Sequence, residues 1–311
     1  QHVWVKYGTG VAACYDLEGN RKWMIRTHFN DDATTSMPSP MLAGDLLIIA
    51  GGNGWWRRNS KSPKLPAAGK NFGHWMIGVE AASGKIRWDA GPLRSGGYGG
   101  PETPYPVKLT NGKEELWVIA TGQGQILRAQ DGKLLLDDLG ANCCFFASPV
   151  ARGNVVYFTR GGHTLAVELA MQDRDTVGAR ILWKSGGGGV PGTVWYDGLL
   201  HCSSGTKDRG AAGALAYLAK DAASGADVAR IDPVLPGSSG DDYVPTCAGG
   251  KYVFVFGGNA GAVVECGRNP RVLAKMKNER MYAQPVFDGD RMYLRTYTSL
   301  ICIGPKGKEG R

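Results

Sequence analysis

A repeating unit of strands and glycine turns runs through the sequence and constrains its fold more than any other feature. Each copy has a small-residue start with proline, a glycine turn, an apolar strand, a second turn, another apolar strand and an ending of the form G-K-x-x-W. The fourth copy reads "FFASPVARGNVVYFTRGGHTLAVELA" and then "RILWKSGG". From Trp88 to Leu135, which replaces tryptophan in the third copy, is 47 residues, and from Leu135 to Trp183 is 48. Such a steady period indicates one structural unit per repeat.

Four short strands per repeat predict an all-β fold, a β-propeller built of four-stranded antiparallel blades. We expect one propeller domain over residues 1–311 with seven blade units, the first and last incomplete. The expected units are 1–35, 36–92, 93–140, 141–187, 188–235, 236–278 and 279–311. Because the sequence opens and ends within a blade, we expect a domain truncated at its N-terminus and taken from a ring of eight blades.

Three tryptophans occupy the same place in their copies, at the fourth strand: Trp23, Trp88 and Trp183. A propeller blade cannot bury both of its faces alone, so neighbouring blades must stack. A large indole at a recurring position suits the space between two such sheets. We therefore expect these tryptophans to be structural.

Composition excludes several classes of protein. The 311 residues contain no run of 18 apolar residues, so no transmembrane segment is predicted. The formal net charge is +8, but no run of five basic residues occurs, so nucleic-acid binding is not expected. Seven cysteines without a CxxC pair exclude zinc-finger and c-type haem sites.

The segment "GVAACYDLEGNRKW", from Gly10 to Trp23, follows the pattern G-x-x-x-A-x-D-x-x-G-x-x-x-W with cysteine at the alanine place, and "GVEAASGKIRW", from Gly78 to Trp88, keeps its ending G-x-x-x-W in a shorter form. This pattern resembles the PQQ-like (quinoprotein) propeller repeat, and the resemblance covers nearly the whole sequence. The bacterial PQQ-binding-like repeat proteins are related to the propeller subunit of the outer-membrane β-barrel assembly machinery. The resemblance implies a bacterial, exported protein, periplasmic or extracellular, with its export signal upstream of this chain.

The resemblance leaves the function open, because the repeat serves both enzymes and binding proteins. The leading hypothesis is a non-catalytic exported scaffold that binds a protein partner or a cell-envelope component, with no cofactor and no catalytic residue. One alternative is a PQQ-dependent oxidoreductase similar to the quinoprotein alcohol dehydrogenases, which hold PQQ with calcium. A second alternative is a glycan-binding accessory module.

Two adjacent cysteines, Cys143 and Cys144, are the candidate redox or cofactor contact. Their adjacency resembles the vicinal disulfide that covers the quinone in the dehydrogenases. Strand alternation, however, sends neighbouring side chains to opposite faces, which favours a packing role. No metal site is predicted, because the histidines show no ligand spacing. The run Asp173–Asp175 is interpreted as a polar loop.

The candidate binding surface lies in two loops that interrupt the repeat. The insertion between Gly51 and His74 carries Trp55 and Trp56 beside Arg57 and Arg58, residue types that are enriched in binding hot spots. A second loop, "SGGYGGPETPYP", adds Tyr98 and Tyr105. Packing of one tryptophan against a neighbouring blade is the alternative interpretation of the insertion.

Overall fold

The structure is a computed structural model, and it describes most of the chain. The described residues are 1–27, 38–52, 74–94, 103–140, 143, 147–160, 163–186, 193–205, 215–235, 246–257, 260–277, 284–296 and 298–305. They form 26 strands and no helix. Among these residues, no helix is long and apolar enough to cross a membrane.

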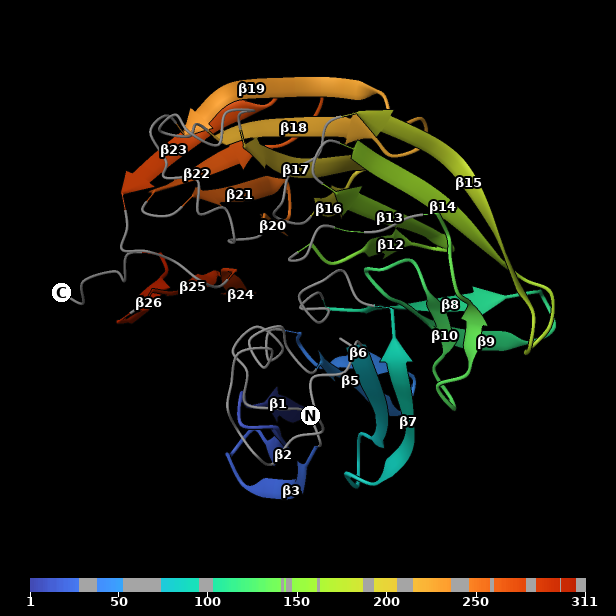
Figure 1. The fold of residues 1–311 in the computed structure, drawn as a ribbon. Coiled ribbons are helices and arrows are strands. Elements are labelled where there is room, and N and C mark those ends of the chain that lie inside the picture. The colour runs from blue at the N-terminus through green and yellow to red at the C-terminus, as the bar shows by residue number, and fades with distance from the viewer. Residues whose placement is uncertain are drawn as a thin grey trace, which may run out of the picture. The chain divides into compact units, whose positions relative to one another are not determined.

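The strands form seven antiparallel sheets within the described residues, and each sheet follows chain order (Figure 1). The first and last sheets have three strands and the other five have four. This confirms the predicted all-β propeller with seven units and incomplete end copies. The ring of eight blades stays a prediction.

The strand bounds follow the repeat. The first three sheets contain β1 (His2–Lys6), β2 (Val11–Asp16) and β3 (Arg21–Arg26); β4 (Met41–Ala43), β5 (Leu46–Gly52), β6 (His74–Glu80) and β7 (Ile86–Leu93); β8 (Tyr105–Thr110), β9 (Glu115–Ala120), β10 (Ile126–Arg128) and β11 (Leu134–Leu136). The fourth and fifth contain β12 (Val150–Arg152), β13 (Val155–Arg160), β14 (His163–Met171) and β15 (Val177–Gly186); β16 (Thr193–Tyr196), β17 (Leu199–Gly205), β18 (Leu215–Asp221) and β19 (Asp227–Leu235). The last two contain β20 (Cys247–Gly249), β21 (Tyr252–Gly257), β22 (Ala260–Glu265) and β23 (Arg271–Lys277); β24 (Val286–Asp288), β25 (Arg291–Arg295) and β26 (Leu300–Ile303).

Two compact units divide the chain: residues 1–158 with 165–182, and residues 159–164 with 183–311. The first unit contains apolar clusters between successive sheets, such as Ile48, Met76 and Trp88 with Ile119 and Leu127. The second unit has its own cluster, in which Tyr217 and Ala219 of β18 pack with Val253 and Val255 of β21. Each cluster draws residues from two neighbouring sheets, so burial of apolar surface holds the stack together.

The tryptophans on the last strand of their sheets contact the next sheet in the same way: Trp23 of β3, Trp88 of β7 and Trp183 of β15. Each indole Nε1–H donates a hydrogen bond to an alanine carbonyl: Trp23 to Ala81 at 3.0 Å, Trp88 to Ala129 at 2.9 Å and Trp183 to Ala222 at 3.1 Å. The ring also lies against a glycine with positive φ in the same turn, at Gly84, Gly132 and Gly225. A Cβ built on these glycines would lie 2.5–2.8 Å from the ring. We call this contact the tryptophan dock.

The third sheet lacks the dock toward the fourth. The register pairs Ile126 with Leu136 as it pairs Gly78 with Trp88, so Leu136, and not Leu135, takes the tryptophan place. The facing turn between β14 and β15, residues 172–176, contains no glycine. Charged side chains occupy this position, as described below.

Candidate functional site

Most residues of the sequence-predicted binding surface lie outside the described residues: Trp55, Trp56, Arg57, Arg58 and Tyr98. Tyr105 is described. It opens β8, is half-buried and packs against the apolar cluster between the third and fourth sheets. Its ring therefore contributes to the core of the first unit.

Of the two adjacent cysteines, Cys143 is described and Cys144 lies outside the described residues. Cys143 is buried and belongs to the same apolar cluster as Val118 and Phe158. Its backbone N–H donates a 2.6 Å hydrogen bond to the carbonyl of Gly122. The surroundings of Cys143 are those of a packed core position.

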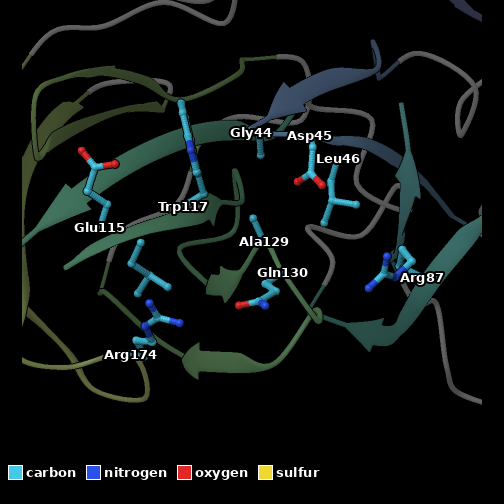
Figure 2. Close-up of a pocket in the computed structure, with 11 residues that line it drawn as sticks. Gly44, Asp45, Leu46, Arg87, Glu115, Trp117, Ala129, Gln130 and Arg174 are labelled. Carbon is cyan, nitrogen blue, oxygen red and sulfur yellow. The ribbon is translucent and has the colours of Figure 1, made fainter. Parts of the chain in front are cut away.

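A surface pocket of about 260 Å³ opens in the first unit, between the hairpin turn of the second sheet and the third sheet (Figure 2). Its apolar floor is formed by buried side chains of both sheets: Ala43, Leu46, Leu116 and Ala129. Its polar lining consists of Asp45, Arg87, Glu115, Gln130 and Arg174, together with the indole of Trp117. We call it the Trp117 pocket.

The local sequence explains why Trp117 borders an open space. Trp117 lies in the middle of β9, opposite Lys108 of β8, and is only half-buried. Gly44 occupies the β4–β5 turn with φ of 66°, and a Cβ built there would lie 3.4 Å from the indole. The turn therefore approaches the ring closely because it has no side chain at this position. Asp45 follows Gly44 and brings a carboxylate to the same place.

Most charges of the pocket are already paired. Arg87 binds Glu80 at 2.7 Å, Glu115 binds Lys108 at 2.7 Å, and Arg174 binds Glu114 at 3.0 Å. Asp45, Gln130 and the Trp117 Nε1–H have no side-chain partner within the described part of the chain. The pocket thus combines an aromatic ring, an amide and one uncompensated carboxylate.

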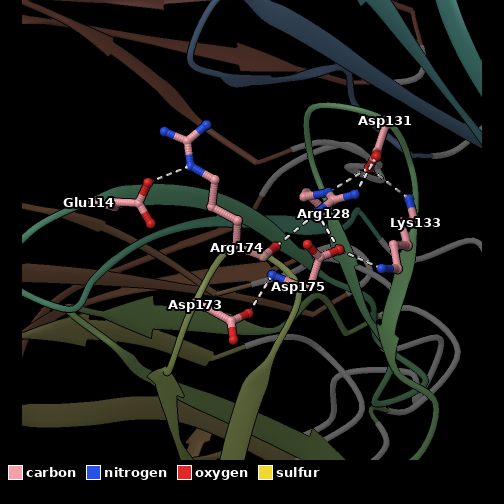
Figure 3. A network of polar contacts seen from close by, with 7 residues as sticks. All are labelled: Glu114, Arg128, Asp131, Lys133, Asp173, Arg174 and Asp175. Carbon is pink, nitrogen blue, oxygen red and sulfur yellow. Dashed lines mark hydrogen bonds and ion pairs between the residues drawn. The ribbon is translucent and has the colours of Figure 1, made fainter.

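A charged network adjoins the pocket where the tryptophan dock is missing (Figure 3). Arg128 of β10 binds Asp131 through Nε at 2.8 Å and reaches the β14–β15 turn through Nη1, at Arg174 O (2.9 Å) and Asp175 Oδ1 (3.0 Å). Lys133 binds the same Asp175 oxygen at 2.5 Å. The run Asp173–Asp175, predicted as a polar loop, lies in the turn between β14 and β15 of the fourth sheet. Its hydrogen bonds to Arg128 and Lys133 hold this turn against the third sheet. We call this set the charged seam.

The contacts of the charged seam shift the pKa values of Arg128, Asp131 and Asp175. The hydrogen bonds that Arg128 donates to Asp131 and Asp175 raise the pKa of Arg128 above its usual value. The pKa of Asp131 is lowered chiefly by Arg128, and that of Asp175 chiefly by Lys133. All these groups are held in their charged forms.

Arginine also engages the acidic pair near Cys143. Arg94 binds Asp138 at 2.8 Å and Asp137 at 3.3 Å, and Gln125 donates a 2.8 Å hydrogen bond to Asp137. The pKa of Asp138 is lowered by the backbone N–H of Gly140 and then by Arg94. Within the described ranges, no three His, Cys, Asp or Glu side chains gather closely enough to hold a metal ion.

Nothing in the sequence distinguishes Trp117 or Asp45 as a candidate site residue. Trp117 stands in a strand, "ELWVIA", where alternation alone cannot tell a covered ring from an open one. Asp45 is an ordinary turn residue in "AGD". Only the approach of the two sheets brings them together.

Comparison with known proteins finds solved structures of the same fold. No protein-family model matches the sequence, and no curated protein is similar to it at the sequence level. Solved structures do match. BamB from Moraxella catarrhalis is 12% identical with a TM-score of 0.61, and the match covers 97% of this chain and 80% of BamB. The Dos1 propeller is 11% identical with a TM-score of 0.56, covering 97% and 74%.

The C-terminal domain of Pseudomonas aeruginosa PilY1 is 10% identical with a TM-score of 0.55, and the match covers 96% of this chain and 91% of that domain. At these identities the matches establish the fold alone. The chain is similar to β-propellers along nearly its whole length.

Proposed function

We propose that this chain is a non-catalytic propeller scaffold of the PQQ-like type that binds a protein partner through its hairpin turns. On the resemblance of its repeat, we further propose that it is exported and acts in the periplasm or outside the cell. The observation that carries the proposal is the Trp117 pocket, where the indole N–H of Trp117 and the carboxylate of Asp45 have no side-chain partner among the described residues. Aromatic side chains that border a pocket with an apolar floor are typical of binding sites.

The engagement of the carboxylates supports a scaffold over a quinone enzyme. Calcium in proteins takes six to eight oxygen ligands at one place. Asp131 and Asp175 are held by Arg128 and Lys133, and Asp137 and Asp138 by Arg94. These four carboxylates are therefore already paired with basic side chains.

Affinity capture with chemical cross-linking tests this proposal. The purified chain is used as bait in an extract of its source cells, with an amine-reactive cross-linker. A partner captured in stoichiometric amounts should cross-link to lysines of the turns near the pocket, Lys85, Lys113 and Lys133, more than to Lys275 of β23. Saturable uptake of PQQ with calcium, together with dye-coupled alcohol oxidation, would instead establish the enzyme and overturn the proposal.

A further inference from the structure

The charge balance of the Trp117 pocket points to the kind of group it binds. Arg87, Glu115 and Arg174 each have an ion-pair partner, at 2.7, 2.7 and 3.0 Å. Asp45 has none within the described residues. Once the paired charges cancel, one negative charge remains at the pocket. A cation is therefore the complementary ligand.

The shape of the pocket indicates which kind of cation fits. Figure 2 shows Asp45 with its carboxylate turned toward the space above Ala129, and Trp117 on the opposite side. A volume of about 260 Å³ lies below the 300–1,000 Å³ typical of drug-sized ligands and suits one long side chain. The floor of Ala43, Leu46 and Ala129 is apolar and suits a methylene stem.

We propose that the Trp117 pocket binds an arginine side chain of the protein partner. The inference rests on the proposed scaffold function and names the group that the scaffold recognises. The guanidinium stacks on the indole of Trp117 and donates paired hydrogen bonds to the carboxylate of Asp45. The amide oxygen of Gln130 accepts a further N–H at the rim.

Other ligands satisfy fewer of these groups. A lysine ammonium is compact and cannot form the planar, two-bond contact with a carboxylate while stacking on a ring. A carboxylate or phosphate would be repelled by Asp45. A neutral sugar could stack on Trp117 but would leave the charge of Asp45 without a counter-charge.

The test is a titration followed by NMR of the tryptophan indole N–H groups in the full chain. The Trp117 signal is identified by its loss in Trp117→Phe. The probe is the peptide acetyl-Gly-Arg-Gly-amide, and the comparison peptides carry citrulline, lysine or glutamate in place of arginine. We expect a saturable shift of the Trp117 signal with the arginine peptide and at least fivefold weaker binding of the citrulline peptide, which keeps the shape but lacks the charge.

Matched variants separate the carboxylate from its surroundings. Asp45→Asn should weaken binding of the arginine peptide at least fivefold. Glu168→Gln, which removes a carboxylate that pairs with Arg180 and does not line the pocket, should change it less than twofold. If the indole N–H spectrum of Asp45→Asn matches that of the wild-type chain without peptide, the variant retains the fold.

Three results would overturn the inference: no shift of the Trp117 signal with the arginine peptide, equal binding by Asp45→Asn, or equal shifts with methyl glucoside. The last result would assign the pocket to a glycan. None of them would remove the scaffold function, because capture of a partner uses no arginine probe. Loss of partner capture together with a normal peptide titration would overturn the scaffold function but not the binding of arginine by the pocket.

Discussion

At the scale of single residues, the tryptophan dock depends on the absence of a side chain. Gly132 has φ of 72°, and a Cβ there would lie 2.6 Å from the ring of Trp88. The same geometry recurs at Gly84 with Trp23 and at Gly225 with Trp183. Two requirements therefore act on one residue: a left-handed backbone and room for an indole.

Gly132→Ala separates these two requirements when it is compared with Gly112→Ala. Gly112 also has positive φ, but a Cβ there would meet nothing within 4 Å. We expect Gly112→Ala to lower the free energy of unfolding by about 1–2 kcal/mol, the cost of the backbone alone. Gly132→Ala should cost about 2–5 kcal/mol, because the indole must also move. Urea unfolding measures both, and equal losses would contradict a packing role for the dock.

A second residue-scale feature is the buried His201 of β17. Its Nδ1 lies 2.7 Å from the hydroxyl of Tyr217, and its Nε2 lies 3.4 Å from the carbonyl of Tyr196. A carbonyl only accepts, so Nε2 carries the proton and Nδ1 accepts from Tyr217. Burial lowers the pKa of His201 to about 4.

The lowered pKa of His201 predicts acid sensitivity. The unfolded chain takes up the proton below pH of about 6.5, whereas the folded chain resists it until about 4, so stability falls as the pH drops through this window. The loss by pH 4 should be about 3 kcal/mol. In His201→Gln, whose amide oxygen can still accept from Tyr217, the slope of unfolding free energy against pH should flatten between 6.5 and 4. An unchanged slope would show that other groups dominate.

At the scale of elements, the charged seam replaces the tryptophan dock between the third and fourth sheets. Leu136 cannot donate the hydrogen bond that Trp88 gives to Ala129, and the β14–β15 turn lacks the glycine that receives a ring. Arg128 instead carries the contact through Asp175 and the carbonyl of Arg174. Ion pairs and hydrogen bonds join the sheets at this boundary, whereas tryptophan docks join them at the boundaries that contain Trp23, Trp88 and Trp183.

Arg128→Met tests how much the charged seam contributes. Its side chain is 14% exposed, so the substitution removes sheltered, charge-assisted hydrogen bonds. We expect the free energy of unfolding to fall by about 1–3 kcal/mol. The matched change is Arg180→Met, whose side chain is 72% exposed and pairs with Glu168 on the surface. It should cost no more than about 0.5 kcal/mol. Thermal unfolding of both variants checks this, and similar losses would refute the special role of Arg128.

The repeat predicted the number of sheets and the propeller fold, because each copy encodes its own strands and turns. It also located the recurring indoles Trp23, Trp88 and Trp183. It could not locate the Trp117 pocket, since the exposure of one indole face depends on how closely the Gly44 turn of another sheet approaches. The role of Arg174 and Asp175 was hidden for the same reason. Their partners lie more than 40 residues away in the chain.

At the scale of the whole molecule, burial differs sharply between the sheets. Ala262 and Val264 of β22 are fully buried. The residues of β26, the third strand of the last sheet described, are all exposed. Leu300 is 72% exposed, and Val286 of β24 is 62% exposed. Apolar side chains on a strand at the edge of a sheet favour pairing with other chains.

Self-association through this last sheet is therefore expected in concentrated solution. Lysine on an edge strand opposes such pairing because its charge must stay hydrated. In sedimentation velocity, the wild-type chain should sediment faster as its concentration rises, whereas a chain with Val286→Lys and Leu300→Lys should not. Leu17→Lys is the control, since Leu17 is 61% exposed but lies in the turn after β2. Any new positive charge on a chain of net charge +8 increases repulsion between copies. If Leu17→Lys suppresses association as well as the double variant does, the added charge is responsible and not the edge of β26.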